Sequence, residues 1–217
     1  MREEILQKRY YRKDTSGKTV EDWHGLCQRV AKAVSKNDSE IEMFFKVMKK
    51  CLFLPNTPAL TNAGRPDFSM SACFVLPVED SINGIYDTLK NTAIVHKMGG
   101  GTGFNFSRLR PTGDIVGTTK GIASGPCSFM KIFNAGTEVM KQGGTRRGAN
   151  MGILRVDHPD IFDFIALKEQ DGEYRNFNLS VAITDEFMNA VRNNSDFPLR
   201  FNGKVRRTGK ARDIWNK

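Results

Sequence analysis

The chain has 217 residues, of which 39% are hydrophobic, 26% charged and 10% aromatic, as in ordinary folded globular proteins. No apolar run approaches the roughly 20 residues that span a bilayer, and the charged N-terminus lacks the apolar core of a secretory signal. We therefore expect a cytoplasmic protein with no membrane partner. The length suits one sizeable domain, or one domain with a small helical lobe.

The formal net charge of +9 is unevenly distributed along the chain. Residues 200–217 hold seven basic residues and one acidic residue, and we expect them to form a solvated, frayed end. Residues 101–150 hold seven basic and two acidic residues among glycines, which suits a site for phosphate. A nucleic-acid groove is the competing interpretation. The arginines of residues 101–150 are not interleaved with aromatic side chains that could stack on bases, so we expect no nucleic-acid partner.

Cysteine and histidine spacing gives little support for a metal site, so we expect none. The cysteines are Cys27, Cys51, Cys73 and Cys127. None forms a Cys-x-x-Cys pair, and the three histidines lie far apart in the sequence. In a cytoplasmic chain we expect reduced thiols, most of them buried as small apolar residues.

The first fifty residues carry apolar side chains at helical spacing. Thr19 is the candidate N-cap of one helix, and Ser39 with Glu42 resembles a capping box at the start of the next. Such stripes are more typical of core packing than of a cofactor surface. We expect residues 1–54 to form a helical lobe with a structural role.

Strands and helices are expected to alternate from residue 71 onward, after a loop at residues 55–67 that begins where two prolines end the helical pattern. The expected strands are residues 71–76 (short and buried), 104–109, 151–156 and 177–184. The expected helices begin at Asp80 or Ser81, Pro126, Pro159 and Asp185. This alternation favours an α/β architecture with largely parallel strands.

Two glycine-rich segments stand between these elements. Four glycines within residues 99–103 suit a sharp turn or a close approach of the backbone, and alone they fit a tight helix-to-strand turn as well as a ligand loop. Residues 142–150 place Arg146 and Arg147 between glycines, and guanidinium groups suit phosphate oxygens and base faces. Gln142 adds an amide that can match base edges. This second loop predicts nucleotide binding.

Four motifs resemble ribonucleotide reductase large subunits, in the order and at the spacing of that family. They are Pro55-Asn-Thr-Pro, Ser71-Ala-Cys-Phe-Val-Leu-Pro-Val-Glu-Asp-Ser-Ile, Gly99-Gly-Gly-Thr-Gly-Phe-Asn-Phe-Ser-Arg-Leu-Arg-Pro and Gln142-Gly-Gly-Thr-Arg-Arg-Gly-Ala-Asn-Met-Gly. The sequence of residues 98–111 is most similar to that of the adenosylcobalamin-dependent class, with the iron-dependent class as the alternative. The resemblance implies that the helical lobe is followed, over residues 55–217, by roughly the first half of a ten-stranded α/β barrel.

The resemblance also implies roles for individual residues. Cys73 would be the first member of the cysteine pair that gives two electrons to the ribose. The substrate site would be lined by Thr57, Ala72, Gly101, Gln142 and Arg146. The site of a dNTP effector would be formed by Asp80, Ser81, Ile82, Arg110 and Lys120. The loop at residues 142–150 would carry information between the two sites, since its glycines let it adopt several shapes.

The implied activity is the reduction of a ribonucleoside di- or triphosphate by thiyl radical chemistry, with adenosylcobalamin and a thioredoxin-like reductant. The family also needs a radical cysteine in an Asn-x-Cys-x-Glu context and a second redox cysteine after it. Neither motif occurs in these 217 residues, and Cys127 matches neither. We expect a truncated sequence, a natural fragment or half of a split enzyme, inactive alone and part of a homodimer. A non-catalytic, nucleotide-binding regulatory module is the alternative.

Overall fold

The computed structural model describes residues 3–117, 120–140, 148–169 and 172–217. The chain divides into two compact units, each with its own hydrophobic core. The first unit comprises Met1–Phe74, Val95–Gly101 and Lys141–Gly148, and the second comprises Val75–Ile94, Thr102–Met140 and Ala149–Lys217.

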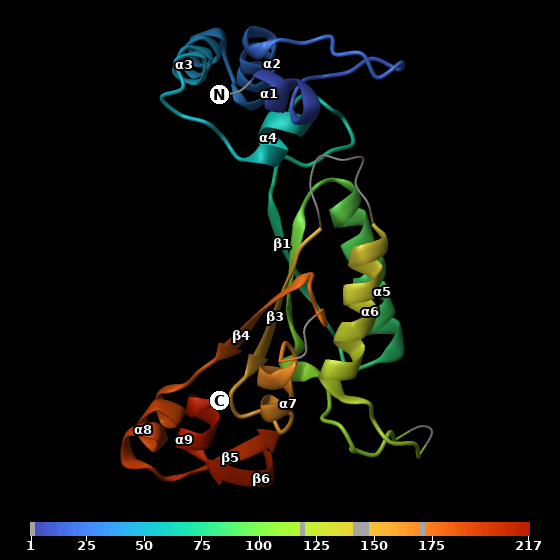
Figure 1. The fold of residues 1–217 in the computed structure, drawn as a ribbon, viewed down its shortest axis with the longest axis vertical. Helices are drawn as coiled ribbons and strands as arrows, with labels where there is room; N and C mark the ends of the chain where they lie inside the picture. Colours follow the sequence, from blue (N-terminus) through green and yellow to red (C-terminus); the bar gives the residue numbers. More distant parts are fainter. Residues whose placement is uncertain (1–2, 118–119, 141–147, 170–171) are drawn as a thin grey trace. The chain divides into compact units, whose positions relative to one another are not determined.

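Helices dominate the N-terminal part of the first unit (Figure 1). They are α1 (Glu3–Arg9), α2 (Trp23–Val34), α3 (Asp38–Lys49) and α4 (Thr57–Asn62). The apolar stripes of α2 and α3 supply its core, in which Leu26, Cys27 and Met48 are almost fully buried. The predicted helical N-terminal region is therefore confirmed, and its stripes do serve packing.

The helix starts differ in detail from the prediction. Asp22, rather than Thr19, caps α2 with its side chain, because Thr19 pairs with Lys13 in an isolated β-bridge. Asn37, rather than Ser39, caps α3 in the same way. In both cases a short polar side chain just before the apolar stripe accepts a backbone hydrogen bond from the first turn.

Residues 55–67 are not a continuous loop as predicted, because they contain α4. The Asn56 side chain caps this helix by accepting from the Ala59 backbone nitrogen at 2.9 Å. Pro58 falls in the first turn, where the missing N–H of a proline costs nothing. The preceding helix α3 ends at Lys49, before either proline, so the prolines do not end it, and Pro58 is part of the next helix.

A four-stranded sheet has the order β1 (Cys73–Pro77), β2 (Gly101–Asn105), β3 (Asn150–Arg155) and β4 (Phe177–Ala182). The strands β2, β3 and β4 pair in parallel, with Gly152 opposite both Phe104 and Leu179. From β1 onward strands alternate with helices up to α8, so the predicted α/β class is confirmed. Residues 106–109, expected to extend β2, form the 3₁₀ turn η1 (Phe106–Arg108) and its C-cap instead.

The two long helices α5 (Ile82–Lys97) and α6 (Gly125–Val139) lie side by side on one face of the sheet (Figure 1). Between sheet and helices is an aromatic core in which Phe104, Phe106, Phe133 and Phe177 are at most 1% exposed. The rings of Phe104 and Phe133 are 4.9 Å apart between centroids, in a tilted arrangement. No helix in the described part of the chain is long and apolar enough to cross a membrane.

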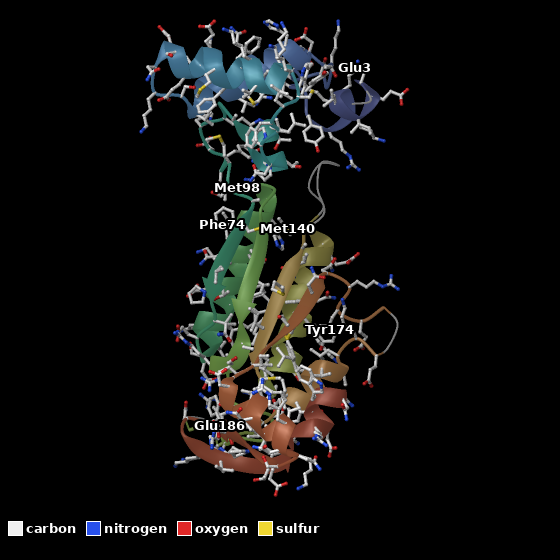
Figure 2. All side chains as sticks on the ribbon, turned by 90° about the vertical axis from the view of Figure 1, so that its left-hand side faces the viewer. Glu3, Phe74, Met98, Met140, Tyr174 and Glu186 are labelled. Atoms are coloured by element: carbon white, nitrogen blue, oxygen red, sulfur yellow. The ribbon has the colours of Figure 1, made fainter. Side chains whose placement is uncertain are left out.

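The C-terminal residues form a small layer rather than the predicted frayed end. It consists of α7 (Ile161–Ala166), α8 (Asp185–Asn193), β5 (Asp196–Phe201), β6 (Lys204–Lys210) and α9 (Ala211–Asn216). The antiparallel hairpin of β5 and β6 buries Phe197 and Leu199, and the Phe187 ring packs 5.1 Å from that of Phe197. The basic residues of β6 are exposed along the whole strand, while β5 supplies the buried side chains of the hairpin, so a high positive charge coexists with an ordered hairpin. Figure 2 shows the side chains of this layer, with Glu186 of α8 labelled.

Candidate nucleotide and thiol sites

Two residues predicted for an effector site, Asp80 and Arg110, are in contact. The Arg110 guanidinium donates to Asp80 Oδ2 from Nε at 2.8 Å, and the Arg110 backbone nitrogen donates to Oδ1 at 3.2 Å. Both side chains are about one third exposed, at 30% and 32%. The pair therefore offers a cation and a carboxylate to solvent while each side chain orients the other.

The next two predicted residues begin α5. The Ser81 hydroxyl accepts from the Gly84 backbone nitrogen at 3.0 Å, which caps the helix. Ile82 is the first helical residue, and its side chain is exposed. The free backbone N–H groups of a helix start thus lie directly after Asp80, where they favour an anion.

A buried histidine and aspartate hold the segment that carries Arg110. His158 and Leu109 are joined by a 3.0 Å hydrogen bond between the ring Nε2 and the backbone oxygen. The Asp160 backbone nitrogen donates to His158 Nδ1 at 3.1 Å, so Nδ1 accepts and the hydrogen is on Nε2. Asp160 Oδ2 accepts from the Thr112 backbone nitrogen at 2.9 Å and from its hydroxyl at 3.0 Å. Arg110 is therefore fixed on both sides along the chain.

Sequence reasoning missed His158 and Asp160. A signal was present, because the run Asp157-His-Pro-Asp begins one residue after β3, at the carboxyl end of a parallel strand. Polar residues at that edge of a parallel α/β sheet are typical of ligand sites or of the residues that support them. The histidine is only 2% exposed, and this burial lowers the pKa of His158 against the opposing effects of the Leu109 carbonyl and of Asp160 and Asp157.

We expect His158 to make the chain less stable in acid. Its pKa is lower when folded than when unfolded, so stability is fully present above the unfolded value near 6.5 and is lost as pH falls through the folded value. Urea unfolding at pH 7 and pH 5 should show a smaller loss of stability in His158→Gln than in the wild type. His24→Gln, which removes an exposed histidine, is the matched control, and an equal pH response of the three proteins would contradict the prediction.

The predicted effector residue Lys120 is in contact with the backbone of residues that precede it. Its backbone nitrogen donates to the Val116 oxygen at 2.8 Å, and the backbone of Ile115 bridges that of Ile122. Nearby in the sequence, Asp114 pairs with Arg206 of β6 at 2.9 Å. The Lys120 side chain is exposed and its described contact is made by its backbone, so its role at the effector site stays a prediction.

The predicted thiol, Cys73, is the first residue of β1 and is exposed. Next to it, the Ala72 backbone oxygen accepts from the Gly101 nitrogen at 2.7 Å, so two predicted substrate residues are in contact. The expected short, buried strand at residues 71–76 is wrong in its burial, since Cys73 and Val75 on one face of β1 are both exposed. The thiol is accessible in this chain.

The glycine run before β2 has a packing reason. A Cβ atom on Gly100 would lie 2.7 Å from Val95 Cγ1 and 2.8 Å from the Phe74 ring. These distances are shorter than real Cβ atoms adopt. The backbone at Gly100 can therefore pack this close to Val95 and Phe74 only because glycine has no side chain. The predicted close approach is therefore one between parts of the chain itself, and it brings Gly101 to Ala72.

The remaining predicted substrate residues are Thr57, Gln142 and Arg146. Thr57 is the first residue of α4, and its Oγ1 is 3.4 Å from the Tyr10 hydroxyl. Gln142 and Arg146 lie outside the described residues. The described residues predicted for the substrate site, Thr57, Ala72 and Gly101, belong to the first unit, and the residues predicted for the effector site belong to the second.

The four thiols differ in accessibility. Cys51 and Cys73 are exposed, Cys127 is intermediate and Cys27 is buried, so the expectation that most are buried is wrong. Burial raises the pKa of Cys27 to about 11 and that of Cys127 to about 12, which keeps both protonated near neutral pH. Among the described residues, no group of three or more His, Cys, Asp or Glu side chains is placed to hold a metal ion.

The structure thus combines a four-stranded α/β sheet, a glycine-shaped backbone beside an exposed strand thiol, and an arginine–aspartate ion pair at the start of a helix. Residues 71–215 match the family description "Ribonucleotide reductase, barrel domain", and residues 1–67 match "Ribonucleotide reductase, all-alpha domain". The chain belongs to the ribonucleotide reductase large-subunit family. The family predicted from the four motifs is confirmed, and the partial barrel agrees with it.

Curated relatives agree with this assignment. The chain is 56% identical over 180 residues to the vitamin B12-dependent ribonucleoside-diphosphate reductase of Thermoplasma acidophilum, covering 81% of this chain and 23% of the relative. It is 42% identical over 200 residues to the protein of the same name from Mycobacterium tuberculosis, covering 88% and 29%. The ribonucleoside-diphosphate reductase large subunit of Monkeypox virus is 37% identical over 202 residues, covering 89% and 26%. The chain thus spans less than a third of each relative's length.

Proposed function

We propose that this chain is part of an adenosylcobalamin-dependent ribonucleotide reductase that converts ribonucleoside diphosphates to deoxyribonucleotides. The observation that carries the proposal is the exposed Cys73 thiol beside the Ala72–Gly101 contact, within a barrel-family fold. The two relatives named as vitamin B12-dependent support this class over the iron-dependent one. Their names specify a ribonucleoside diphosphate, which is the basis for choosing it over a triphosphate.

In the proposed reaction Cys73 is one of two thiols that supply electrons. A thiyl radical on a third cysteine removes the 3′ hydrogen of the ribose, and the 2′ hydroxyl leaves as water. At the end of the reaction the same cysteine returns the hydrogen to C3′, which restores the thiyl radical. The two thiols give up two electrons and two protons and end as a disulfide, while a hydrogen replaces the hydroxyl at C2′. A thioredoxin-like dithiol then reduces the disulfide by exchange. The radical cysteine and the second electron-donating cysteine are assigned to the part of the protein outside this chain.

The chain's own residues have binding roles in this proposal. The Thr57 hydroxyl and the bare backbone at Ala72 and Gly101 would hold the substrate, with Gln142 and Arg146 facing its base. Adenosylcobalamin supplies the radical when bound, and we assign no residue of this chain to it. We infer that the complete enzyme is a homodimer and that this chain does not turn over alone.

We infer a dNTP effector site in the second unit. Asp80 would accept from the effector's ribose hydroxyl, while the start of α5 at Ser81 and Ile82 offers backbone donors. Arg110 would bind the triphosphate, with Lys120 alongside it. Support comes from the 2.8 Å Asp80–Arg110 pair, which is partly exposed and held in place by His158 and Asp160.

The test is turnover of a ribonucleoside diphosphate by the complete protein that contains this chain, with adenosylcobalamin and a dithiol reductant. Cys73→Ser should lower the multiple-turnover rate at least about 100-fold, because no disulfide can form without this thiol. Cys51→Ser, which removes the other exposed thiol, should keep the wild-type rate. A Cys73→Ser enzyme that turns over at the wild-type rate would refute the assignment.

A further inference from the structure

Two of the four thiols belong to one pair of packed helices. The helices α2 and α3 lie against each other in the first unit and are joined only by residues 35–37 (Figure 1). Cys27 is in the second turn of α2, and Cys51 directly follows Lys50, the C-cap of α3. Neither cysteine has a role in the proposed reaction or in the proposed effector site.

The start of α2 meets the end of α3. The Trp23 indole nitrogen donates to the Lys49 backbone oxygen at 3.3 Å. The rings of His24 and Phe45 are 4.9 Å apart between centroids. Side chains on a helix lean toward its N-terminus, so the Cys27 thiol lies over the turn that begins at Trp23. The fold therefore directs this thiol toward the end of α3.

Hydrogen bonds fix the backbone that carries Cys51. Its nitrogen donates to the Met48 oxygen at 2.8 Å, and the Leu52 nitrogen donates to the Val47 oxygen at 3.0 Å. These two bonds are those of a Schellman motif, in which the residue after the C-cap is left-handed. Cys51 has the positive φ, 55°, that this motif requires. The Cys51 thiol is therefore carried by a fixed turn at the end of α3.

The two thiols are close enough to affect each other electrostatically, and they differ in accessibility. Burial, followed by the negative charge of a Cys51 thiolate, raises the pKa of Cys27 to about 11, while the Lys49 ammonium opposes this effect. Cys27 is 0% exposed, whereas Cys51 is exposed. Of the two, only Cys51 can be reached by a reagent in solution, and Cys27 can react only with a sulfur that is brought to it.

We propose that Cys27 and Cys51 form a reversible disulfide when the chain meets a low-molecular-weight disulfide. The Cys51 sulfur attacks one sulfur of the reagent, the S–S bond of the reagent breaks, and one small thiol leaves with the proton of Cys51. The Cys27 sulfur then attacks the Cys51 sulfur and releases the second small thiol, which takes the proton of Cys27. The two cysteines lose two electrons, and the reagent is reduced to two thiols.

The disulfide would close a ring of residues 27–51 and join the start of α2 to the end of α3. A crosslink of this kind restricts the unfolded chain, so it stabilises the folded state. This inference goes beyond the proposed reductase function, because the crosslink requires neither Cys73 nor a nucleotide. It can hold or fail independently of that function.

The test is incubation of the 217-residue chain with oxidised glutathione, followed by peptide mapping without reduction. We expect one crosslinked pair of peptides that contains Cys27 and Cys51. We also expect a rise in melting temperature of at least about 5 °C that a dithiol reverses. Cys51→Ser and Cys27→Ala should each remove the crosslink and the rise. Cys73→Ser, which removes the other exposed thiol, is the matched control and should keep both.

The variant Cys27→Ala also tests the order of the two steps. Its Cys51 should stay joined to glutathione, which the mass of the chain shows, because the second attacking thiol is missing. In the wild type, a stable adduct of Cys51 with glutathione and a free Cys27 thiol would overturn the proposal, since the two sulfurs would then be unable to meet. A crosslink between Cys51 and Cys73, or one between two chains, would overturn it as well.

Discussion

A deoxynucleoside triphosphate is expected to raise the melting temperature of the chain, and Arg110→Ala is expected to remove most of that rise. At a ligand concentration 100 times Kd, mass action stabilises the folded state by about 2.7 kcal/mol, or about 5–10 °C for a chain of this size. Loss of a charge-assisted phosphate contact costs about 2–3 kcal/mol and weakens Kd about 100-fold. The remaining stabilisation would then be about 0.4 kcal/mol, which is about 1 °C.

Two variants make this result specific. Arg108→Ala removes an arginine two residues away that pairs with Glu79 at the same 2.8 Å distance but is about two thirds exposed. The rise in melting temperature of Arg108→Ala with dNTP should equal that of the wild type. This result would exclude a general loss of positive charge as the cause of the effect of Arg110→Ala. Cys73→Ala should also keep the shift. A Cys73→Ala chain that loses as much of the shift as Arg110→Ala would contradict the separation of effector and thiol sites.

The parallel α/β part of the fold could be predicted because its signals are local. The strands β1 and β3 contain short apolar runs, β2 follows a glycine run, and each helix has an apolar face with a start signal close by. Pro126 falls in the first turn of α6, and α8 begins at Asp185 as expected. The predictions that failed were helix starts that depend on contacts with other residues. Thr19 was the predicted cap of α2, but it pairs with Lys13, and Asp22 caps the helix instead.

The C-terminal hairpin was missed for a different reason. Its charge was taken as a sign of a solvated end, whereas the alternation of buried residues in β5 and the dipeptide Asn202-Gly203 predict a hairpin. Both turn residues have positive φ, 48° and 73°, as a two-residue hairpin turn of this kind requires. Positive charge along the exposed strand β6 is compatible with burial of alternate side chains on its partner β5, so net charge alone could not decide whether these residues fold.

The candidate site was predictable only in part, because its contacts are distant in sequence. Asp80 and Arg110 are thirty residues apart, and family resemblance rather than spacing placed them together. His158 and Asp160 reach Leu109 and Thr112 across 49 and 48 residues, and no local pattern encodes that contact. Which residues hold Arg110 in place depends on the order of the strands in the sheet. Local sequence patterns do not contain that order.

The same support makes Gly125 a sensitive position, and Gly125→Ala is expected to destabilise the chain by about 3 kcal/mol. Gly125 has a φ of +75°, where an L side chain costs about 1–2 kcal/mol. Its new Cβ would also collide with Thr112 Oγ1 and lie 2.6 Å from Asp160 Oδ2, and such overpacking costs about 1–3 kcal/mol. Urea unfolding measures the loss.

Gly113→Ala separates the two contributions. Gly113 has a φ of +88° but no atom within 4 Å of the position of its Cβ, so only the backbone term applies and the cost should be about 1 kcal/mol. The displacement of Thr112 and Asp160 in Gly125→Ala should also weaken the dNTP shift, because these residues fix the segment that carries Arg110. Equal costs for the two glycine variants would show that the contact of Gly125 with Thr112 and Asp160 is not tight, and would contradict the prediction.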